Sequence, residues 1–265
     1  MTLYRRDWPV PEGTSPRGAI LLVHGLGEHS GRYGHVATAL TAAGFTVRAY
    51  DQRGFGRSDG TRGGIPSALA LVDDLRIEFE RFTREHGDAF LFGHSMGGLV
   101  VARAVTGGFV KPLGMLLSSP AITPRLTPFD RFATRVGLRI APNLGVPHKL
   151  KLDQLSHDPT NAVAIATDPL CHARVTPRLA AFLRDAGEQA INDASRCHVP
   201  TLLVVSGDDR LVDPAGSRRF RESLPPGVGD MKVYPTLWHE LLNERAADRD
   251  AVLATIIEWL VARSR

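Results

Sequence analysis

This sequence contains few of the residues that cross-link or anchor a polypeptide. Its only two cysteines, Cys171 and Cys197, occur in no CxxC or metal-ligand spacing, which argues against a disulfide framework and against a zinc site. The longest unbroken apolar runs, such as residues 19–23, are far too short to span a bilayer. Residues 1–13 contain two arginines but no apolar stretch of the kind that a signal peptide carries. We therefore expect a cytoplasmic protein.

Lysine is also scarce, because the chain has only four and arginine supplies the rest of its 32 basic residues. The formal net charge is only +4 and no basic run exceeds a few residues, so nucleic-acid binding is not expected. A length of 265 residues with 43% hydrophobic content is enough for one large domain with a sizeable core. The composition is that of an ordinary globular protein, and the motifs must supply its function.

Short apolar runs rich in β-branched residues alternate with amphipathic stretches along most of the chain. The runs predict strands at 19–24, 46–51, 89–93, 113–119, 201–207 and 231–235. The amphipathic stretches predict helices at 33–43, 67–86, 95–107, 177–194, 215–223 and 246–263. In the second of these helices, Ser67 is the expected N-cap. The alternation predicts an α/β fold with a mostly parallel central sheet and helices on both faces.

Residues 120–176 interrupt this alternation. The segment is rich in proline, contains no good strand and shows one short helical pattern, at 129–140. We interpret it as a lid or cap inserted over the C-terminal edge of the sheet. The predicted organisation is therefore a core of residues 1–119 and 177–265, with a cap of residues 120–176.

Residues 93–97 are Gly-His-Ser-Met-Gly, directly after a buried strand and directly before a helix. In α/β proteins a nucleophilic serine occupies such a strand-to-helix turn, and small flanking residues make room for it. Gly93 and Gly97 supply that room, and the turn would hold the Ser95 hydroxyl above the sheet. The alternative is a tight turn in which Ser95 only caps the helix. We expect Ser95 to be a catalytic nucleophile.

A serine hydroxyl needs a base near neutral pH, and that base needs a third group to orient it. On this fold an acidic residue and then a histidine follow the serine along the chain. Of the ten histidines, His239 comes after the last predicted strand, at the edge where open α/β sheets bind ligands. His94 is adjacent to the serine and should point elsewhere. We expect His239 to be the base, and the alternative is a solvated loop histidine.

Three aspartates after the predicted strand at 201–207 compete for the role of the acid. Asp213 precedes Pro214 and a helical pattern, an arrangement typical of a helix N-cap. Asp208 and Asp209 are adjacent and point in opposite directions, so only one of them can reach the histidine. The local pattern leaves the choice between these two open.

The oxyanion of a tetrahedral intermediate needs two backbone N–H donors. We expect one from Met96, the residue after the serine. We expect the other from Leu26, in the glycine-rich loop at 24–33 that follows the first predicted strand. The alternative is that this loop is a glycine-rich turn that binds nothing.

Four motifs in this order resemble the monoacylglycerol lipase and lysophospholipase branch of the α/β-hydrolase superfamily. They are HGLGEHSGRY (24–33), YDQRGFGRSDGTRG (50–63), GHSMGG (93–98) and SGDDRLVDP (206–214). The resemblance covers residues 18–262 and implies an α/β-hydrolase fold with a mobile cap. It implies that Asp209 is the acid and His239 the base. It also implies that Glu28 and Arg32 lie near the polar end of the pocket, where a glycerol headgroup is held.

The expected activity is that of a serine hydrolase acting on carboxylic esters of lipid-like substrates, above all monoacylglycerols, through an acyl-enzyme on Ser95. This chemistry needs no metal or cofactor, and its partner is a small lipid ester. A lysophospholipase, a general carboxylesterase, a peptidase or a thioesterase could use the same three residues. The alternative outside catalysis is a ligand-binding protein on a hydrolase fold.

The predicted cap helix combines an apolar stripe with positive charge. Residues 125–151 contain four arginines and two lysines against one aspartate, a net charge of +5. A basic amphipathic helix commonly lies at a membrane surface. Our hypothesis is that Phe129, Phe132 and Val136 face an acyl chain or the bilayer. Arg131, Arg135 and Arg139 would then meet anionic headgroups. The alternative is that the stripe packs on the core and the arginines are solvated.

Overall fold

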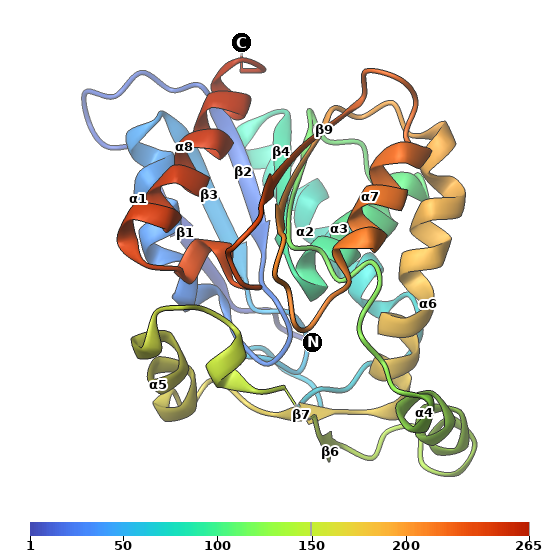
Figure 1. Ribbon diagram of the computed structural model, residues 1–265. Helices are drawn as coiled ribbons and strands as arrows, with labels where there is room; N and C mark the ends of the chain where they lie inside the picture. The colour runs from blue at the N-terminus through green and yellow to red at the C-terminus, as the bar shows by residue number, and fades with distance from the viewer. Residues whose placement is uncertain (149, 265) are drawn as a thin grey trace.

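The structure, a computed structural model, describes residues 1–148 and 150–264 and is built around one seven-stranded sheet (Figure 1). The strand order is β1-β3-β2-β4-β5-β8-β9, with β1 antiparallel and each later pair parallel. The strands are β1 (Arg5–Trp8), β2 (Gly18–Val23), β3 (Phe45–Tyr50), β4 (Ala89–His94), β5 (Met115–Ser118), β8 (Thr201–Ser206) and β9 (Gly229–Tyr234). The carboxyl ends of the parallel strands therefore share one edge, where a site can form.

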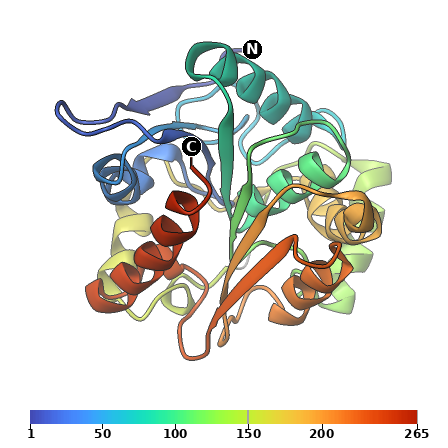
Figure 2. The same cartoon turned by 90° about the horizontal axis from the view of Figure 1, so that it is seen from above.

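Helices cover both faces of the sheet, which confirms the predicted α/β fold. The helices α1 (Gly34–Ala42) and α8 (Ala246–Val261) cover one face. The helices α2 (Ala70–His86), α3 (Met96–Thr106), α6 (Pro177–Asp193) and α7 (Pro214–Ser223) cover the other. Figure 2 shows the red α8 and the orange α6 and α7 on opposite sides of the strands.

The strand β2 explains why the predicted strands are apolar almost throughout. Side chains alternate between the two faces of a strand. Ile20 and Leu22 accordingly enter the core under α1 and α8, whereas Leu21 and Val23 enter the core under α2 and α3. Because both faces are covered, neither set of positions can be polar.

The structure differs from the sequence expectations at two elements of the core. The strand β1, Arg-Arg-Asp-Trp, was not predicted, because an exposed edge strand tolerates charge and shows no apolar run. The helix α2 begins at Ala70, and Ser67 is not its N-cap. Leu69 occupies that position without a side-chain bond, and the Ser67 carbonyl accepts the Ala70 N–H.

The segment 120–176 lies at the carboxyl edge of the sheet, at the bottom of Figure 1. It contains α4 (Pro128–Ile140), α5 (Pro159–Thr167) and a two-stranded pair of β6 (Val146–Pro147) and β7 (Arg174–Val175). The expectation of one helix and no strand was incomplete. The helix α5 carries the start signal of a capping Asp158 followed by Pro159, but its nine residues show no clear apolar stripe.

None of the helices in the described ranges is both long and apolar enough to cross a bilayer. The most amphipathic exposed element is α4, which has no buried residue and packs against α6. The segment 120–176 is thus held to the core along α6 and also near its middle, where Arg32 donates to Asn161 and the Glu240 N–H donates to the Leu155 carbonyl.

We predict that the close contact between α6 and the start of this segment contributes to the free energy of unfolding. A Cβ at Gly187 would overlap the Ile122 carbonyl oxygen, so Gly187→Ala should lower the free energy of unfolding by about 1–3 kcal/mol. Gly34 has helical φ and ψ and open space at its Cβ position, so Gly34→Ala should be neutral or raise that energy by up to about 1 kcal/mol. Urea unfolding of the two variants measures both values, and an equal effect would contradict this account of the packing.

Candidate active site

Ser95 occupies the turn between β4 and α3 in a backbone conformation that residues other than glycine rarely adopt. Its φ is 51° and its ψ is −117°. A Cβ at Gly97 would overlap the Val23 carbonyl oxygen, and a Cβ at Gly93 would lie 2.5 Å from the Gly97 carbonyl oxygen. The close approach of β2, β4 and α3 therefore imposes the strained turn on Ser95. Ser95 is the N-cap residue of α3, but its side chain makes no capping hydrogen bond, so capping does not account for the serine hydroxyl.

Ser95 lies at one end of a chain of hydrogen bonds formed by three separate loops. Its Oγ is 2.8 Å from His239 Nε2, and His239 Nδ1 is 2.7 Å from Asp209 Oδ2. Asp209 Oδ1 accepts the N–H groups of Leu211 and Val212 at 2.8 and 2.9 Å, which fixes the carboxylate. His239 is 4% exposed, so it is not a solvated loop histidine.

The two other aspartates of this loop have different partners. Asp208 accepts a hydrogen bond from Trp238 Nε1 at 3.0 Å on the exposed side of the loop. Asp213 accepts the Ala215 N–H at 3.0 Å and caps α7, as its position before Pro214 predicted. The structure therefore brings only Asp209 to the histidine.

Burial and charge act in opposite directions on the groups of this chain. Burial alone would raise the pKa of Asp209, but His239 and the two N–H bonds outweigh it and hold that pKa below its usual range. Burial alone would lower the pKa of His239, but Asp209, with smaller contributions from Glu240 and Glu28, raises it. Burial, followed by His239, lowers the pKa of His94 to about 4. His94 is therefore neutral beside the base, with its ring 5.2 Å from that of His239.

The residues expected to supply the oxyanion donors line the same cavity as the serine. Met96 is the first residue of α3, so its N–H is one of the four at a helix start that have no intrahelical acceptor. Leu26 follows Gly25, whose N–H donates to Glu28 Oε1 at 2.6 Å and fixes that loop. Met96, Leu26 and Ser95 all line one cavity. This arrangement suits the stabilisation of a negatively charged oxygen at the serine.

That cavity has a volume of about 370 Å³ and is mainly apolar. The segment 120–176 supplies much of its wall, including Leu150, Leu152, Leu155 and Ile165. These positions lie outside any regular apolar period, which is why the sequence pattern did not single them out. The size and lining suit an acyl chain.

The three apolar side chains predicted on the cap helix do not line this cavity. Among the described residues that form its wall, Phe129, Phe132 and Val136 are absent. Phe129 and Phe132 are 66% and 63% exposed, because α4 contacts α6 along a different face, with Gly137 close to Pro177. The structure thus does not bring these three side chains to this cavity, and their contact with an acyl chain or the bilayer stays a hypothesis.

Glu28 and Arg32 line the cavity together with Glu240. Arg32 Nη1 donates to Glu28 Oε2 at 2.6 Å, and Arg32 Nη2 donates to Glu240 Oε2 at 2.7 Å and to Asn161 Oδ1 at 2.7 Å. Sequence reasoning missed Glu240 and Asn161. The position of Glu240 next to His239 was the available signal, whereas nothing in the pattern of α5 marked Asn161.

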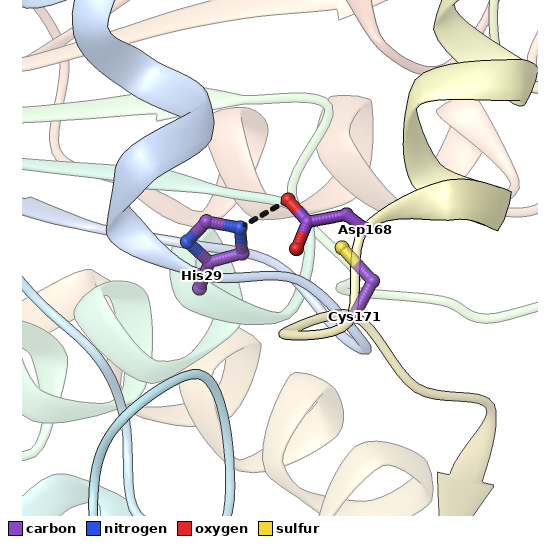
Figure 3. Close-up of side chains that lie close together, drawn as sticks. All are labelled: His29, Asp168 and Cys171. Carbon is purple, nitrogen blue, oxygen red and sulfur yellow. Dashed lines mark hydrogen bonds and ion pairs between the residues drawn. The ribbon is translucent and has the colours of Figure 1, made fainter.

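His29, Asp168 and Cys171 offer three donor atoms within 4.8 Å of one another, an arrangement that could suggest a metal site (Figure 3). His29 Nδ1 accepts a hydrogen bond from the Gly31 N–H at 3.1 Å. Its Nε2 therefore carries the ring proton and donates a hydrogen bond to Asp168 Oδ2 at 2.8 Å. Burial raises the pKa of the Cys171 thiol to about 12. Two of the three groups thus hold protons that a metal would have to displace. The hydrogen bond between His29 and Asp168 instead links the loop at 24–33 to the segment 120–176.

Comparison with known proteins gives a consistent picture. Residues 14–246 match the Hydrolase_4 family, described as serine aminopeptidase, S33. The monoacylglycerol lipase of Mycolicibacterium smegmatis is 35% identical over 255 residues, which cover 94% of this chain and 90% of that protein. The monoglyceride lipase of Homo sapiens is 30% identical, over 99% of this chain and 88% of that protein.

A solved structure resembles this one over its whole length. The monoacylglycerol lipase of Paleococcus ferrophilus superposes with a TM-score of 0.90 and 36% identity, and each chain covers 100% of the other. The resemblance inferred from the four sequence motifs is confirmed by these relatives.

We predict that the two adjacent aspartates differ sharply in their effect on hydrolysis. Asp209→Asn removes the acceptor of the His239 Nδ1 proton, favours the wrong tautomer, and should lower kcat by about ten-thousand-fold. Asp208→Asn changes an exposed contact with Trp238 and should cost less than about threefold. Steady-state kinetics on p-nitrophenyl butyrate measures both, and a larger loss in the Asp208 variant would contradict the assignment.

Proposed function

The chain belongs to the serine aminopeptidase S33 family of hydrolases, and we propose that this serine ester hydrolase cleaves monoacylglycerols through an acyl-enzyme on Ser95. The observation that carries the proposal is the hydrogen-bonded chain from Ser95 through His239 to Asp209, beside a mainly apolar cavity that Glu28 and Arg32 also line. The relatives named monoacylglycerol lipase support the choice of substrate.

The proposed reaction has two matched halves. His239 Nε2 takes the proton of Ser95 Oγ as that oxygen attacks the ester carbonyl carbon, and the Leu26 and Met96 N–H groups bind the oxyanion. The bond between the carbonyl carbon and the glycerol oxygen then breaks, and His239 gives its proton to that oxygen. In the second half, His239 takes a proton from water as the water oxygen attacks the acyl carbon. The bond from that carbon to Ser95 Oγ then breaks, His239 gives the proton to Oγ, and the fatty acid leaves. Asp209 keeps the imidazole in the required tautomer throughout.

The cavity supports a defined orientation of the substrate. The apolar wall made by Leu150, Leu152 and Leu155 suits the acyl chain. The end near Glu28 and Arg32 offers charged acceptors and donors to hydroxyl groups, which suits glycerol. The ester would then lie between the two, at the serine.

The charge at the polar end favours a neutral headgroup over a phosphate. Glu28, Arg32 and Glu240 are buried together and carry a formal net charge of −1. A lysophospholipid would bring an anionic phosphate toward this cluster, where the repulsion is poorly screened. We therefore rank lysophospholipase and general esterase activity below monoacylglycerol hydrolysis.

We also propose that residues 120–176 act as a cap whose helix α4 contacts anionic membranes. Four of the exposed large apolar side chains lie in or just after α4, namely Phe129, Phe132, Ile140 and Leu144. Residues 125–151 have a net charge of +5. Apolar side chains and basic residues on one exposed helix are the combination that binds lipid surfaces. Such a contact would hold the enzyme at the lipid surface that contains its substrate.

For the substrate, we predict that purified enzyme hydrolyses monoacylglycerol with a higher kcat/KM than it shows toward a lysophosphatidylcholine of equal acyl length. Ser95→Ala should fold normally and lose about a million-fold in kcat on both. Release of glycerol or fatty acid measures each rate. A Ser95→Ala variant that kept a tenth of wild-type activity would overturn the mechanism, and faster lysophospholipid cleavage would overturn the choice of substrate.

For the membrane contact, we predict that the protein co-sediments with anionic vesicles at low salt and is released as salt rises. Each basic residue at the surface should contribute about 1 kcal/mol. Phe132→Asp should weaken binding at least about tenfold. Ile77→Asp, which alters another exposed apolar residue on α2, should leave it unchanged. Equal binding to neutral and anionic vesicles, or equal effects of the two substitutions, would leave the cap without this role.

A further inference from the structure

Glu240 directly follows His239 in the chain, yet its side chain is almost completely buried and receives four hydrogen bonds. Its Oε2 accepts from Arg32 Nη2 at 2.7 Å, Asn161 Nδ2 at 3.0 Å and Asn243 Nδ2 at 2.9 Å. Its Oε1 accepts from Arg32 Nη1 at 3.2 Å. A carboxylate with this many donors is held in one orientation, and it holds the turn after His239 in return.

The same carboxylate ties that turn to the segment 120–176. Asn161 belongs to α5 and bonds both Glu240 and Arg32. The Glu240 backbone N–H donates to the Leu155 carbonyl at 2.8 Å. The wall of the cavity on the α5 side is thereby bonded, through one residue, to the loop that carries the base.

The cluster around Arg32 has one more negative than positive charge. Glu28 and Glu240 both bind the single guanidinium, and the three side chains are each no more than 10% exposed. Burial alone would raise the pKa of Glu240, but Arg32 outweighs it and lowers that pKa to about 2. The pKa of Glu28 is also held below its usual range, by Arg32 against the effect of burial. Both carboxyls are therefore ionised at neutral pH, where the three side chains carry a net charge of −1.

His239 is the titratable group that this charge affects in the reaction. Asp209 faces it from the loop after β8, and the neutral His94 faces it from the end of β4. Glu240 and Glu28 both act to raise its pKa, after the larger effects of burial and Asp209. A buried negative charge stabilises the imidazolium that forms when the histidine takes the serine proton.

We propose that Glu240 is a positioning residue of the hydrolytic reaction: it orients the turn that carries His239, bonds that turn to α5, and supplies the buried negative charge that favours the imidazolium. This inference rests on the proposed role of His239 as the base and adds a residue that acts through it. The side-chain hydrogen bonds described for Glu240 go to Arg32, Asn161 and Asn243, so it acts on the reaction through His239.

The test is the pH dependence of kcat/KM on p-nitrophenyl butyrate, which has no glycerol and so does not report headgroup binding. The acid limb of this profile reports the base of the free enzyme, which must be neutral to act. Glu240→Gln removes the charge but keeps the size of the side chain. The midpoint of the acid limb should move to lower pH, at a proton concentration at least about threefold higher than in the wild type. The value of kcat on the plateau should fall about three- to tenfold.

Three further variants separate charge from structure. Glu240→Asp keeps the charge, so its acid limb should stay at the wild-type position although kcat falls. Asn161→Ala loses the bonds to α5 but leaves all three charges, so it should lower kcat without moving the limb. Glu244→Gln makes the same change at a second buried carboxylate of this turn, which binds His157 and Trp238 instead, and should not move the limb.

An unmoved acid limb in Glu240→Gln would overturn the electrostatic role, and a limb that moved equally in Glu244→Gln would show a general effect of substitution. If Glu240→Gln did not fold, a shifted limb in Glu240→Asp would contradict the proposal. Full activity of Ser95→Ala in the same assay would instead remove the proposed function on which the inference rests, so the two failures are distinguishable.

Discussion

The close contact between the backbones of β2, β4 and α3 at Gly93 and Gly97 is the constraint on which the site depends. Those glycines leave no room for a side chain, and the chain can pass from strand to helix there only if Ser95 takes a positive φ. The strained turn lifts the hydroxyl above the sheet edge. The loops after β8 and β9 begin at the same edge of the sheet, because these strands are parallel to β4. Asp209 and His239 lie in these loops and so reach the serine.

The segment 120–176 contacts this site in two different ways. On the α5 side it is bonded to the core by polar groups, through Asn161 to Arg32 and through Asp168 to His29. On the α4 side it exposes large apolar side chains and binds the core mainly along α6. One side thus fixes part of the cavity wall to the loop that carries His239, while the other is bonded through Arg125 to the loop that carries Asp209 and presents an apolar surface.

The sequence predicted the features that follow from local rules. Buried parallel strands, the glycine-flanked serine and a histidine after the last strand each have a recognisable pattern. The choice between Asp208 and Asp209 did not, because it depends on which carboxylate accepts the N–H groups of Leu211 and Val212, and the resemblance to known lipases was needed to make it. The cavity wall and the cluster around Arg32 depend on contacts between segments far apart in the chain, such as those of Arg32 with Asn161 and Glu240. The local spacing of apolar residues carries no information about such contacts.

The central claim is that Ser95 is the nucleophile of an ester hydrolase and owes its reactivity to the turn and to His239. The most direct measurement is mass spectrometry of the enzyme after brief exposure to a fluorophosphonate, followed by peptide mapping. The account predicts one adduct per chain, located on Ser95, and a rate of labelling that falls as pH drops through the titration of His239. An adduct on another residue, or a labelling rate equal to that of a surface serine, would contradict it.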